Sequence, residues 1–363
     1  MMKKLLALLL ALTMVFAFAA CTTDEGNNEE NNGEANNGET NGEGTESALK
    51  IGVILLHDES IGYDFAHMQG IRTACETLGI DWNDNNQVIW KYNIGEDESC
   101  HSAAVDLVDQ GCNVIISDSY GHQSYMTLAA SENPDVQFLI ATGDTAAVDP
   151  YDNTHNFFTH TFESRYVSGV VGGMKLAEMI EEGVLTEDNY NEDGTIKIGY
   201  VGAYPYAEVV SGYTAFYLGV KSVVDNVKMD VTYTNSWADA TAEQQAAEAL
   251  LARGCCLISQ HADSTGGPAA IEAAVQNGAV CYYVGYNIDM LSVAPDVALT
   301  SPQNNWGAYY TYAFEQVMNG KKPEQDWCHG YSNNAVQISP LGKACAAGTQ
   351  EAVDAAIEKI KSG

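Results

Sequence analysis

Polar side chains stand directly after two of the apolar runs that we predict to be buried strands. Asp118 and Ser119 follow one run, and His261 and Asp263 follow the other. Carboxylates, hydroxyls and imidazoles at such places can hydrogen-bond a small molecule, or they can satisfy the backbone at a helix N-terminus. Both interpretations stay open for Asp118 and Ser119, and a single histidine at a strand end is often only a structural hydrogen-bonding residue.

The chain carries none of the common catalytic signatures. It has no Gly-x-Ser-x-Gly elbow, no P-loop, no His-Glu-x-x-His and no cysteine or histidine spacing typical of zinc. A hydrolase that uses Asp118, Asp144 or Asp263 is an alternative. Such an enzyme generally needs a metal-binding aspartate cluster near the first strand, and residues 57–60 are a poor version of one. We therefore predict a binding protein without catalytic residues, metal or cofactor.

Short apolar runs alternate with amphipathic segments, which predicts an α/β fold. Apolar runs of this length, bounded by polar or glycine residues, suit parallel strands that helices cover on both faces. Helical spacing of apolar residues is clear at 65–75 and 246–251. The predicted strands are 51–56, 114–117, 138–141, 198–202, 257–260 and 282–285.

The pattern occurs twice along the chain. Lys-Ile-Gly at 50–52 recurs at 197–199, and residues 103–115 resemble residues 246–258. Such a repeat indicates two similar structural units. We expect two α/β lobes, with a ligand held where the carboxyl ends of their strands face a cleft.

The N-terminus predicts export. Lys3 and Lys4 precede an apolar run over 5–18, and small residues lead into Cys21. This layout is typical of a signal peptide, and a cysteine at the cleavage point resembles a bacterial lipobox. A plain signal peptide with an incidental cysteine is the alternative. We predict a signal peptide over 1–20, lipidation of Cys21, and a disordered, acidic Asn/Gly-rich linker over 21–47 that holds the body on the outer face of the cell membrane.

The charge of the chain limits its partners. Asp and Glu number 49 against 16 Lys and Arg, for a net charge of −33. Such a surface repels nucleic acid and polyanionic ligands, but it accepts neutral or cationic small molecules. The eight cysteines beyond Cys21 allow a disulfide framework, although their positions at strand edges favour free, buried thiols.

Five further motifs lie at 204–210 with 216–220, 235–239, 260–264, 285–290 and 299–301. Together they resemble the basic membrane protein (BMP) family of substrate-binding lipoproteins, and the resemblance runs from residue 50 to about residue 321. It implies a type I periplasmic binding protein with two Rossmann-like lobes, parallel sheets and three crossovers. The implied lobes are 48–161 plus 290–328 and 162–289 plus 329–363, with crossovers near 160–164, 287–291 and 325–330. It also implies a monomer that serves an ABC permease.

The resemblance further implies a purine nucleoside or nucleobase as ligand. The chain departs from the family's motifs at two places where the family is expected to contact the sugar of a nucleoside. Residues 62–64 read Gly-Tyr-Asp where nucleoside binders have Ser-Phe-Asn, and residues 303–305 read Gln-Asn-Asn where a lysine is expected. These departures favour a free nucleobase or another small heterocycle over an intact ribose.

A purine is recognised by aromatic stacking and by polar groups in the plane of its ring. Tyr63 is the stacking candidate in the first lobe, and Asp64 either accepts from the ring or caps a helix. Trp237 either stacks on the ligand or packs as a lid. Asn287 accompanies Asp289, which matches the ligand-binding aspartate of the family. The predicted site is Tyr63, Asp64, Asp118, Ser119, Trp237, His261, Asp263, Asn287 and Asp289.

Two alternatives to uptake remain at this point. The same fold could serve a surface lipoprotein that senses its ligand, and the sequence does not separate sensing from uptake. If the ligand is a purine nucleoside, the hydrolase alternative described above would be a nucleoside hydrolase.

Overall fold

The computed structural model describes residues 49–363, which lie within one compact unit. The predicted signal peptide, Cys21 and almost all of the linker lie outside the described residues. Among residues 49–363, no helix combines the length and the apolarity that a membrane span requires.

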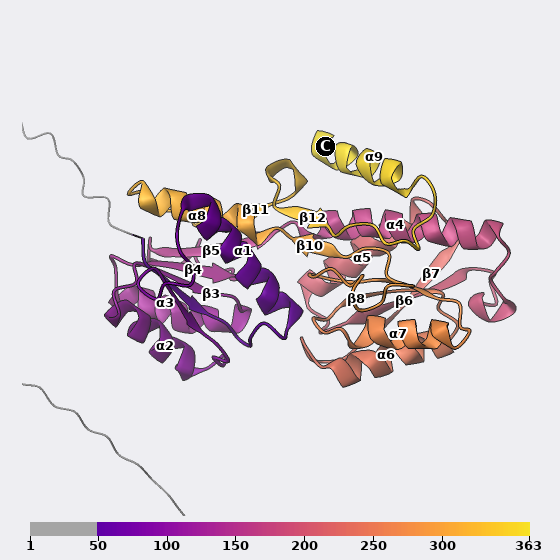
Figure 1. Ribbon diagram of the computed structural model, residues 1–363, viewed down its shortest axis with the longest axis horizontal. Coiled ribbons are helices and arrows are strands. Elements are labelled where there is room, and N and C mark those ends of the chain that lie inside the picture. The colour runs from indigo at the N-terminus through magenta and orange to yellow at the C-terminus, as the bar shows by residue number, and fades with distance from the viewer. Residues whose placement is uncertain (1–48) are drawn as a thin grey trace, which may run out of the picture. The chain divides into compact units, whose positions relative to one another are not determined.

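The first lobe is built on a six-stranded parallel sheet (Figure 1). Its order is β11-β5-β4-β3-β1-β2. Helices α1 and α8 cover one face, and α2 and α3 cover the other. The strands are β1 (Ile51–Ile54), β2 (Val88–Lys91), β3 (Val114–Ser117), β4 (Gln137–Ala141), β5 (Thr154–Thr159) and β11 (Asp326–His329). The helices are α1 (Gly62–Leu78), α2 (Glu98–Asp109), α3 (Gln123–Glu132) and α8 (Trp306–Met318), with a short 3-10 turn at Tyr120–His122.

The second lobe repeats this arrangement around a four-stranded parallel sheet, in the order β7-β6-β8-β9. Helices α4, α5 and α9 pack on one face, and α6 and α7 pack on the other. The strands are β6 (Ile196–Gly202), β7 (Val227–Tyr233), β8 (Leu257–His261) and β9 (Tyr282–Val284). The helices are α4 (Thr161–Glu181), α5 (Ala207–Lys221), α6 (Ala240–Ala252), α7 (Gly266–Gln276) and α9 (Thr349–Ser362), with 3-10 turns at Glu187–Asn189 and Tyr331–Asn333. The predicted α/β fold with two parallel sheets is confirmed.

The chain passes between the lobes three times. The first passage joins β5 to α4. The second runs through β10 (Pro302–Asn304) into α8, and the third leads from β11 through β12 (Val336–Ile338). Strands β10 and β12 pair antiparallel, with Pro302 opposite Ile338. Two separate passages are therefore joined to each other where they leave the lobes.

The second passage lies later in the chain than the sequence analysis placed it. Met290, Ala294 and Val297 are buried in the core of the second lobe, and Ala298 bridges Tyr283 of β9. The predicted crossover at 287–291 is wrong, and residues 290–299 pack with the second lobe instead of the first. Their apolar side chains fill the space beside β9, which a pattern search for strand ends does not detect.

All eight cysteines of the described residues are free, and six of them are buried. This confirms the preference for thiols over a disulfide framework. Each buried thiol packs within one of the hydrophobic cores, where cysteine acts as a small apolar side chain.

Candidate ligand-binding site

A cavity of about 1000 Å³ lies between the two lobes, at the carboxyl ends of their strands. Its walls include Leu56 after β1, Asp118 after β3 and Thr142 after β4 from the first lobe, and Glu208 and His261 from the second. Both sheets are parallel, so their strand ends bring loop residues from distant parts of the chain to one place. A hydrogen bond of 3.3 Å from the Gly62 N–H to the Asp263 carbonyl joins the lobes at the cavity wall.

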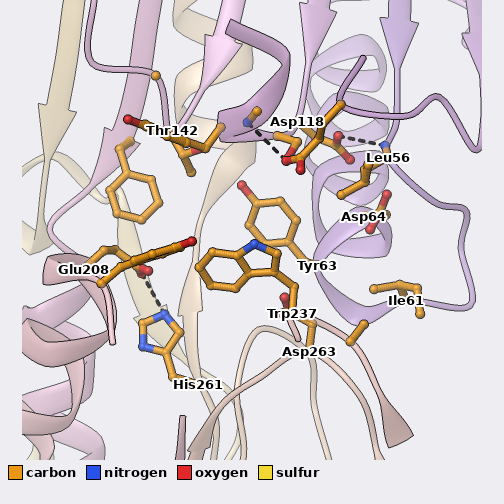
Figure 2. A pocket seen from close by; sticks show the side chains of 18 of the residues that line it. Leu56, Ile61, Tyr63, Asp64, Asp118, Thr142, Glu208, Trp237, His261 and Asp263 are labelled. Carbon is orange, nitrogen blue, oxygen red and sulfur yellow. Dashed lines mark hydrogen bonds and ion pairs between the residues drawn. The ribbon is translucent and has the colours of Figure 1, made fainter. Parts of the chain in front are cut away.

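Aromatic rings enter this cavity from both lobes (Figure 2). Tyr63 projects from α1 and is held edge-on against His67, with the ring centroids 4.6 Å apart. Trp237 projects from the loop after β7 and lies edge-on to Tyr204 at 5.3 Å. Tyr206, which also lines the cavity, lies 6.0 Å from Trp237. A flat ligand can therefore meet a positioned aromatic ring from either lobe.

The polar lining of the cavity is acidic. Among the described residues no lysine or arginine lines it, and its two basic side chains are the imidazoles of His57 and His261. Carboxylates accept hydrogen bonds and repel anions, so this lining favours neutral or cationic ligands that carry N–H or O–H groups. The acidic residues are Asp64, Glu96, Asp118, Asp144, Glu208, Asp263 and Asp326.

Two buried carboxyl groups stand together on the first-lobe side. Asp64 and Asp118 are each only 1% exposed. The backbone N–H of His57 donates to Asp64 Oδ1 at 2.7 Å, and the N–H of Leu56 donates to Asp118 Oδ1 at 3.0 Å. Burial, and then the neighbouring charge of Asp64, raise the pKa of Asp118 well above its usual range. Asp118 Oδ2 is buried and accepts no hydrogen bond from a protein donor, and the residue lines the cavity.

The hydroxyl of Ser119 is already engaged. It donates to Glu96 Oε1 at 2.5 Å, and the N–H of Gly121 donates to the same oxygen at 3.1 Å. Ser119 therefore lines the cavity but serves mainly to hold Glu96 against the 3-10 turn that follows β3.

On the second-lobe side, His261 Nε2 lies 2.7 Å from Glu208 Oε1 (Figure 2). Asp263 lies two residues farther on, and its Oδ1 accepts from Asn287 Nδ2 at 2.9 Å. Burial, and then the nearby charge of Glu243, raise the pKa of Asp263 well above its usual range. Asp263 thus resembles Asp118 as a buried carboxyl group whose environment disfavours the charge.

Seven of the nine predicted site residues line this cavity: Tyr63, Asp64, Asp118, Ser119, Trp237, His261 and Asp263. The other two do not. Asn287 lies behind Asp263 and bonds it, while Asp289 is exposed and accepts from the N–H of Leu291 at 2.9 Å. Both border a second cavity of about 220 Å³. The positive φ of 59° at Asn287 turns the chain away from the larger cavity before Asp289.

Several lining residues were missed from the sequence. Glu208 sits in the first turn of α5, and its motif was noted without assigning the side chain a role. Nothing in the sequence around Tyr286 and Phe158 distinguishes them from aromatic residues of a hydrophobic core. Thr142 has a φ of 58°, which is uncommon for a non-glycine residue and typical of strained functional loops, but no sequence pattern reports it.

Within residues 49–363 no three His, Cys, Asp or Glu side chains are grouped so that they could hold a metal ion. The acidic cavity lining is spread over both lobes instead. The arrangement can stack a flat molecule and accept its hydrogen bonds.

Comparison with known proteins agrees with this geometry. A family model described as "ABC transporter substrate-binding protein PnrA-like" (Bmp) matches residues 56–362. The purine-binding protein of Brucella abortus (strain 2308) is 31% identical over 82% of this chain and 76% of its own length. A Haloferax volcanii protein named as an ABC transporter glucose-binding protein is 28% identical over 83% of this chain and 68% of its own.

Solved structures show the same fold. The ABC transporter solute-binding protein of Aeropyrum pernix K1 superposes with a TM-score of 0.70 at 16% identity, covering 87% of this chain and 92% of that one. The match of the family model over most of the body, together with the relative from Brucella, confirms the resemblance drawn from the motifs. The chain belongs to the Bmp family of PnrA-like substrate-binding proteins of ABC transporters.

Proposed function

We propose that the protein binds a purine nucleobase or nucleoside between its lobes and delivers it to an ABC permease. In this proposal a lipid on Cys21 anchors the chain to the outer face of the cell membrane, and the protein performs no catalysis. Hinge motion between the lobes encloses the ligand, and the closed form docks on the permease.

The observation that carries the proposal is the lining of the larger cavity. Tyr63 and Trp237 enter it from opposite lobes, and the polar groups around them are carboxylates without lysine or arginine. A purine offers a flat face for stacking and ring or amino N–H groups for carboxylates. A phosphorylated ligand would meet repulsion on both sides, so nucleotides are disfavoured.

The choice between base and nucleoside rests on the same residues. Asp64 and Asp118 can accept from the amino and ring N–H groups of a base, and carboxylates also bind the hydroxyls of ribose. Since no lysine within residues 49–363 lines the cavity to assist a sugar, we expect the nucleobase to bind more tightly.

A hexose is a second candidate ligand. The Haloferax relative is named for glucose, and aromatic rings flanked by carboxylates suit a sugar ring as well. Trp237 and Tyr63 would then stack on the apolar face of the pyranose.

Isothermal titration calorimetry tests the proposal. The chain 48–363, which contains all four hydrophobic cores, is unfolded and refolded to remove carried-over ligand. It is then titrated with adenine, adenosine, guanosine, inosine and glucose. We expect a dissociation constant on the order of 1 µM or lower for at least one purine, with the purine recovered unchanged by chromatography.

Heat with glucose and none with any purine would replace the purine proposal by the hexose. Heat with neither would overturn both. Conversion of a nucleoside to base during the titration would favour the hydrolase. Uptake of labelled ligand by cells with and without the gene separates transport from sensing.

A further inference from the structure

Arg165 is the largest charged side chain buried in the second lobe. It is 0% exposed and lies in the first turns of α4, outside the lining of the larger cavity. Its Nη1 donates to the Tyr200 hydroxyl at 2.7 Å and to the Gln260 carbonyl at 2.5 Å. Its guanidinium carbon lies 3.7 Å from the ring centre of Tyr286. Among the described residues no carboxylate forms a direct salt bridge with it, which is unusual for a buried cation.

The guanidinium lies next to the uncommitted side of His261. Gly212 of α5 shows the closeness, because a Cβ added there would lie 2.7 Å from His261 Nδ1 and 3.5 Å from Arg165 Nε. Neither nitrogen has a hydrogen-bond partner, and both are buried. The other ring nitrogen of His261, Nε2, lies 2.7 Å from Glu208 Oε1.

These positions select one form of the imidazole. A carboxylate only accepts hydrogen bonds, so the contact with Glu208 Oε1 favours a proton on Nε2 and leaves Nδ1 as a lone pair, a state that the nearby positive guanidinium also favours. The proton of His261 then lies on Nε2, from which it donates to Glu208. A second proton on Nδ1 would place two positive charges together in a buried space.

We propose that Arg165 is a positioning residue that keeps His261 neutral, with its proton on Nε2, so that Glu208 presents an uncompensated negative charge to the ligand. The inference rests on the proposed function only in placing the ligand against Glu208. It adds a specificity rule, since the ligand must present an N–H or O–H group to the second lobe.

Electrostatics agree with the geometry. Burial, and then the charge of Arg165, lower the pKa of His261 despite the attraction of Glu208. Burial opposes the ionisation of Glu208, but the electrostatic attraction to His261, the hydrogen bond from His261 and then the charge of Arg165 lower the pKa of Glu208 overall. The other groups around the imidazole are Tyr200 of β6, Tyr286 after β9 and Asp263 on its own segment. Burial raises the pKa of both phenols, so they stay neutral and do not compete for the proton.

The first test needs neither a ligand nor a variant of Arg165. The chain 48–363 is produced with nitrogen-15 in its histidine side chains. NMR then records the signals of the imidazole ring nitrogens between about pH 5 and about pH 8. The His261 signal is identified by its loss in His261→Gln. We expect a neutral ring protonated at Nε2 across this range, whereas an ordinary histidine is half protonated near pH 6.5. An ordinary titration, or a proton on Nδ1, would overturn the inference.

The second test uses Arg165→Met, with Arg165→Lys as the matched control that keeps the charge. Circular dichroism is first used to check that both variants fold. In Arg165→Met only burial still opposes the proton that Glu208 attracts, so His261 should titrate as the pH falls and compensate the charge of Glu208. The dissociation constant of Arg165→Met for adenine, divided by that of the wild type, should rise about tenfold as the pH falls from about 7.5 to about 5.5.

In Arg165→Lys this ratio should stay constant with pH, even if affinity is lower at every pH. A ratio that does not change with pH in Arg165→Met would contradict the inference, because a merely structural role lowers affinity uniformly. If adenine does not bind at all, the purine proposal fails, and the NMR result on His261 still decides the role of Arg165.

Discussion

The carboxyl group of Asp118 stands where a folded chain would ordinarily avoid a charge. It is buried next to Asp64, and one of its oxygens has no protein partner. Such an arrangement costs free energy in the absence of ligand and becomes useful when a donor group arrives. Stability given up at one residue for the sake of binding is a common property of functional sites.

Replacing Asp118 by asparagine should therefore stabilise the protein without ligand. The amide oxygen keeps the hydrogen bond from Leu56, while the charge is lost. The folded pKa of Asp118 is raised above its unfolded value, so its unfavourable contribution is absent below about pH 4 and grows as the pH rises. Urea denaturation should show a gain in the free energy of unfolding of about 1 kcal/mol or more near neutral pH, since one pKa unit is worth about 1.4 kcal/mol.

The gain should shrink when the same pair of proteins is compared at lower pH. A gain that is equal at both pH values would show that the effect does not come from ionisation. Loss of stability near neutral pH would show that the charged form of Asp118 is favoured in the fold.

The aromatic rings of the cavity give a second prediction at this scale. Trp237→Ala and Tyr63→Ala should each weaken binding of the purine that titrates in the wild type by roughly tenfold to a hundredfold, because stacking on a base is worth about 1–3 kcal/mol. Calorimetry measures the loss. Tyr190→Ala is the control, since Tyr190 is partly exposed and lines neither cavity. Equal binding by Trp237→Ala and the wild type would remove Trp237 from the site.

Single residues were predictable where a simple rule of topology applies. Asp118, His261 and Asp263 follow buried strands, and parallel strands bring such positions to one edge. Asp289 was placed by motif alone, and the turn at Asn287 moves it out of the larger cavity. Arg165 gave no signal, because its role depends on contacts with β6, β8 and the segment after β9 that are distant in sequence.

Among the elements, α4 and α5 pack with their backbones in close contact. A Cβ added at Gly219 of α5 would lie 2.1 Å from the Tyr166 carbonyl, and one at Gly169 of α4 would lie 2.2 Å from the Phe216 carbonyl. The two backbones touch at these glycines, and this contact sets how α4, with Arg165 in its first turns, lies over the sheet.

Gly219→Ala should be strongly destabilising for this reason. The added methyl group must push the helices apart, and overpacking of this kind costs about 1–3 kcal/mol or more. Gly307→Ala in α8 is the matched control, because the nearest atom to its Cβ would be 3.4 Å away. The control should be neutral or stabilising by up to about 1 kcal/mol. Urea denaturation measures both, and equal free energies of unfolding would contradict the predicted contact.

At this scale the repeat in the sequence identified most of the elements. The predicted strands all exist, since short apolar runs are what a sheet covered on both faces requires. Strands β2, β5 and β11 of the first sheet were missed. Strands β2 and β11 lie at its two edges, where their residues are only partly buried, whereas β5 is buried between β4 and β11. The second passage between the lobes was misplaced because residues 290–299 carry no strand or helix period.

For the whole molecule, the cavity offers a chemical probe. Cys328 is the one exposed thiol within residues 49–363, and it lines the cavity, whereas Cys345 is half-buried and the other six thiols are buried. In the chain 48–363, a thiol-specific reagent such as 5,5′-dithiobis(2-nitrobenzoic acid) should modify Cys328 first. Saturating ligand should slow this reaction, because it fills the space that the reagent must enter.

Cys328→Ser should abolish the fast phase and leave the slower reaction of Cys345. A fast phase that is unchanged by a ligand that calorimetry shows to bind would place the ligand elsewhere. Six fast-reacting thiols would contradict the packed cores.

The passages between the lobes also determine when the protein can fold during its synthesis. The first sheet is completed by β11, which pairs with β5, and α1 packs against α8, yet β11 and α8 come after the whole second sheet in the chain. A nascent chain that ends before residue 306 leaves one edge of that sheet and one face of its core uncovered. The first lobe therefore cannot close while the ribosome is still making the second, and it stays incomplete until the last sixth of the chain is translated. A protein that must pass through a narrow secretion channel before folding is served by this order of assembly.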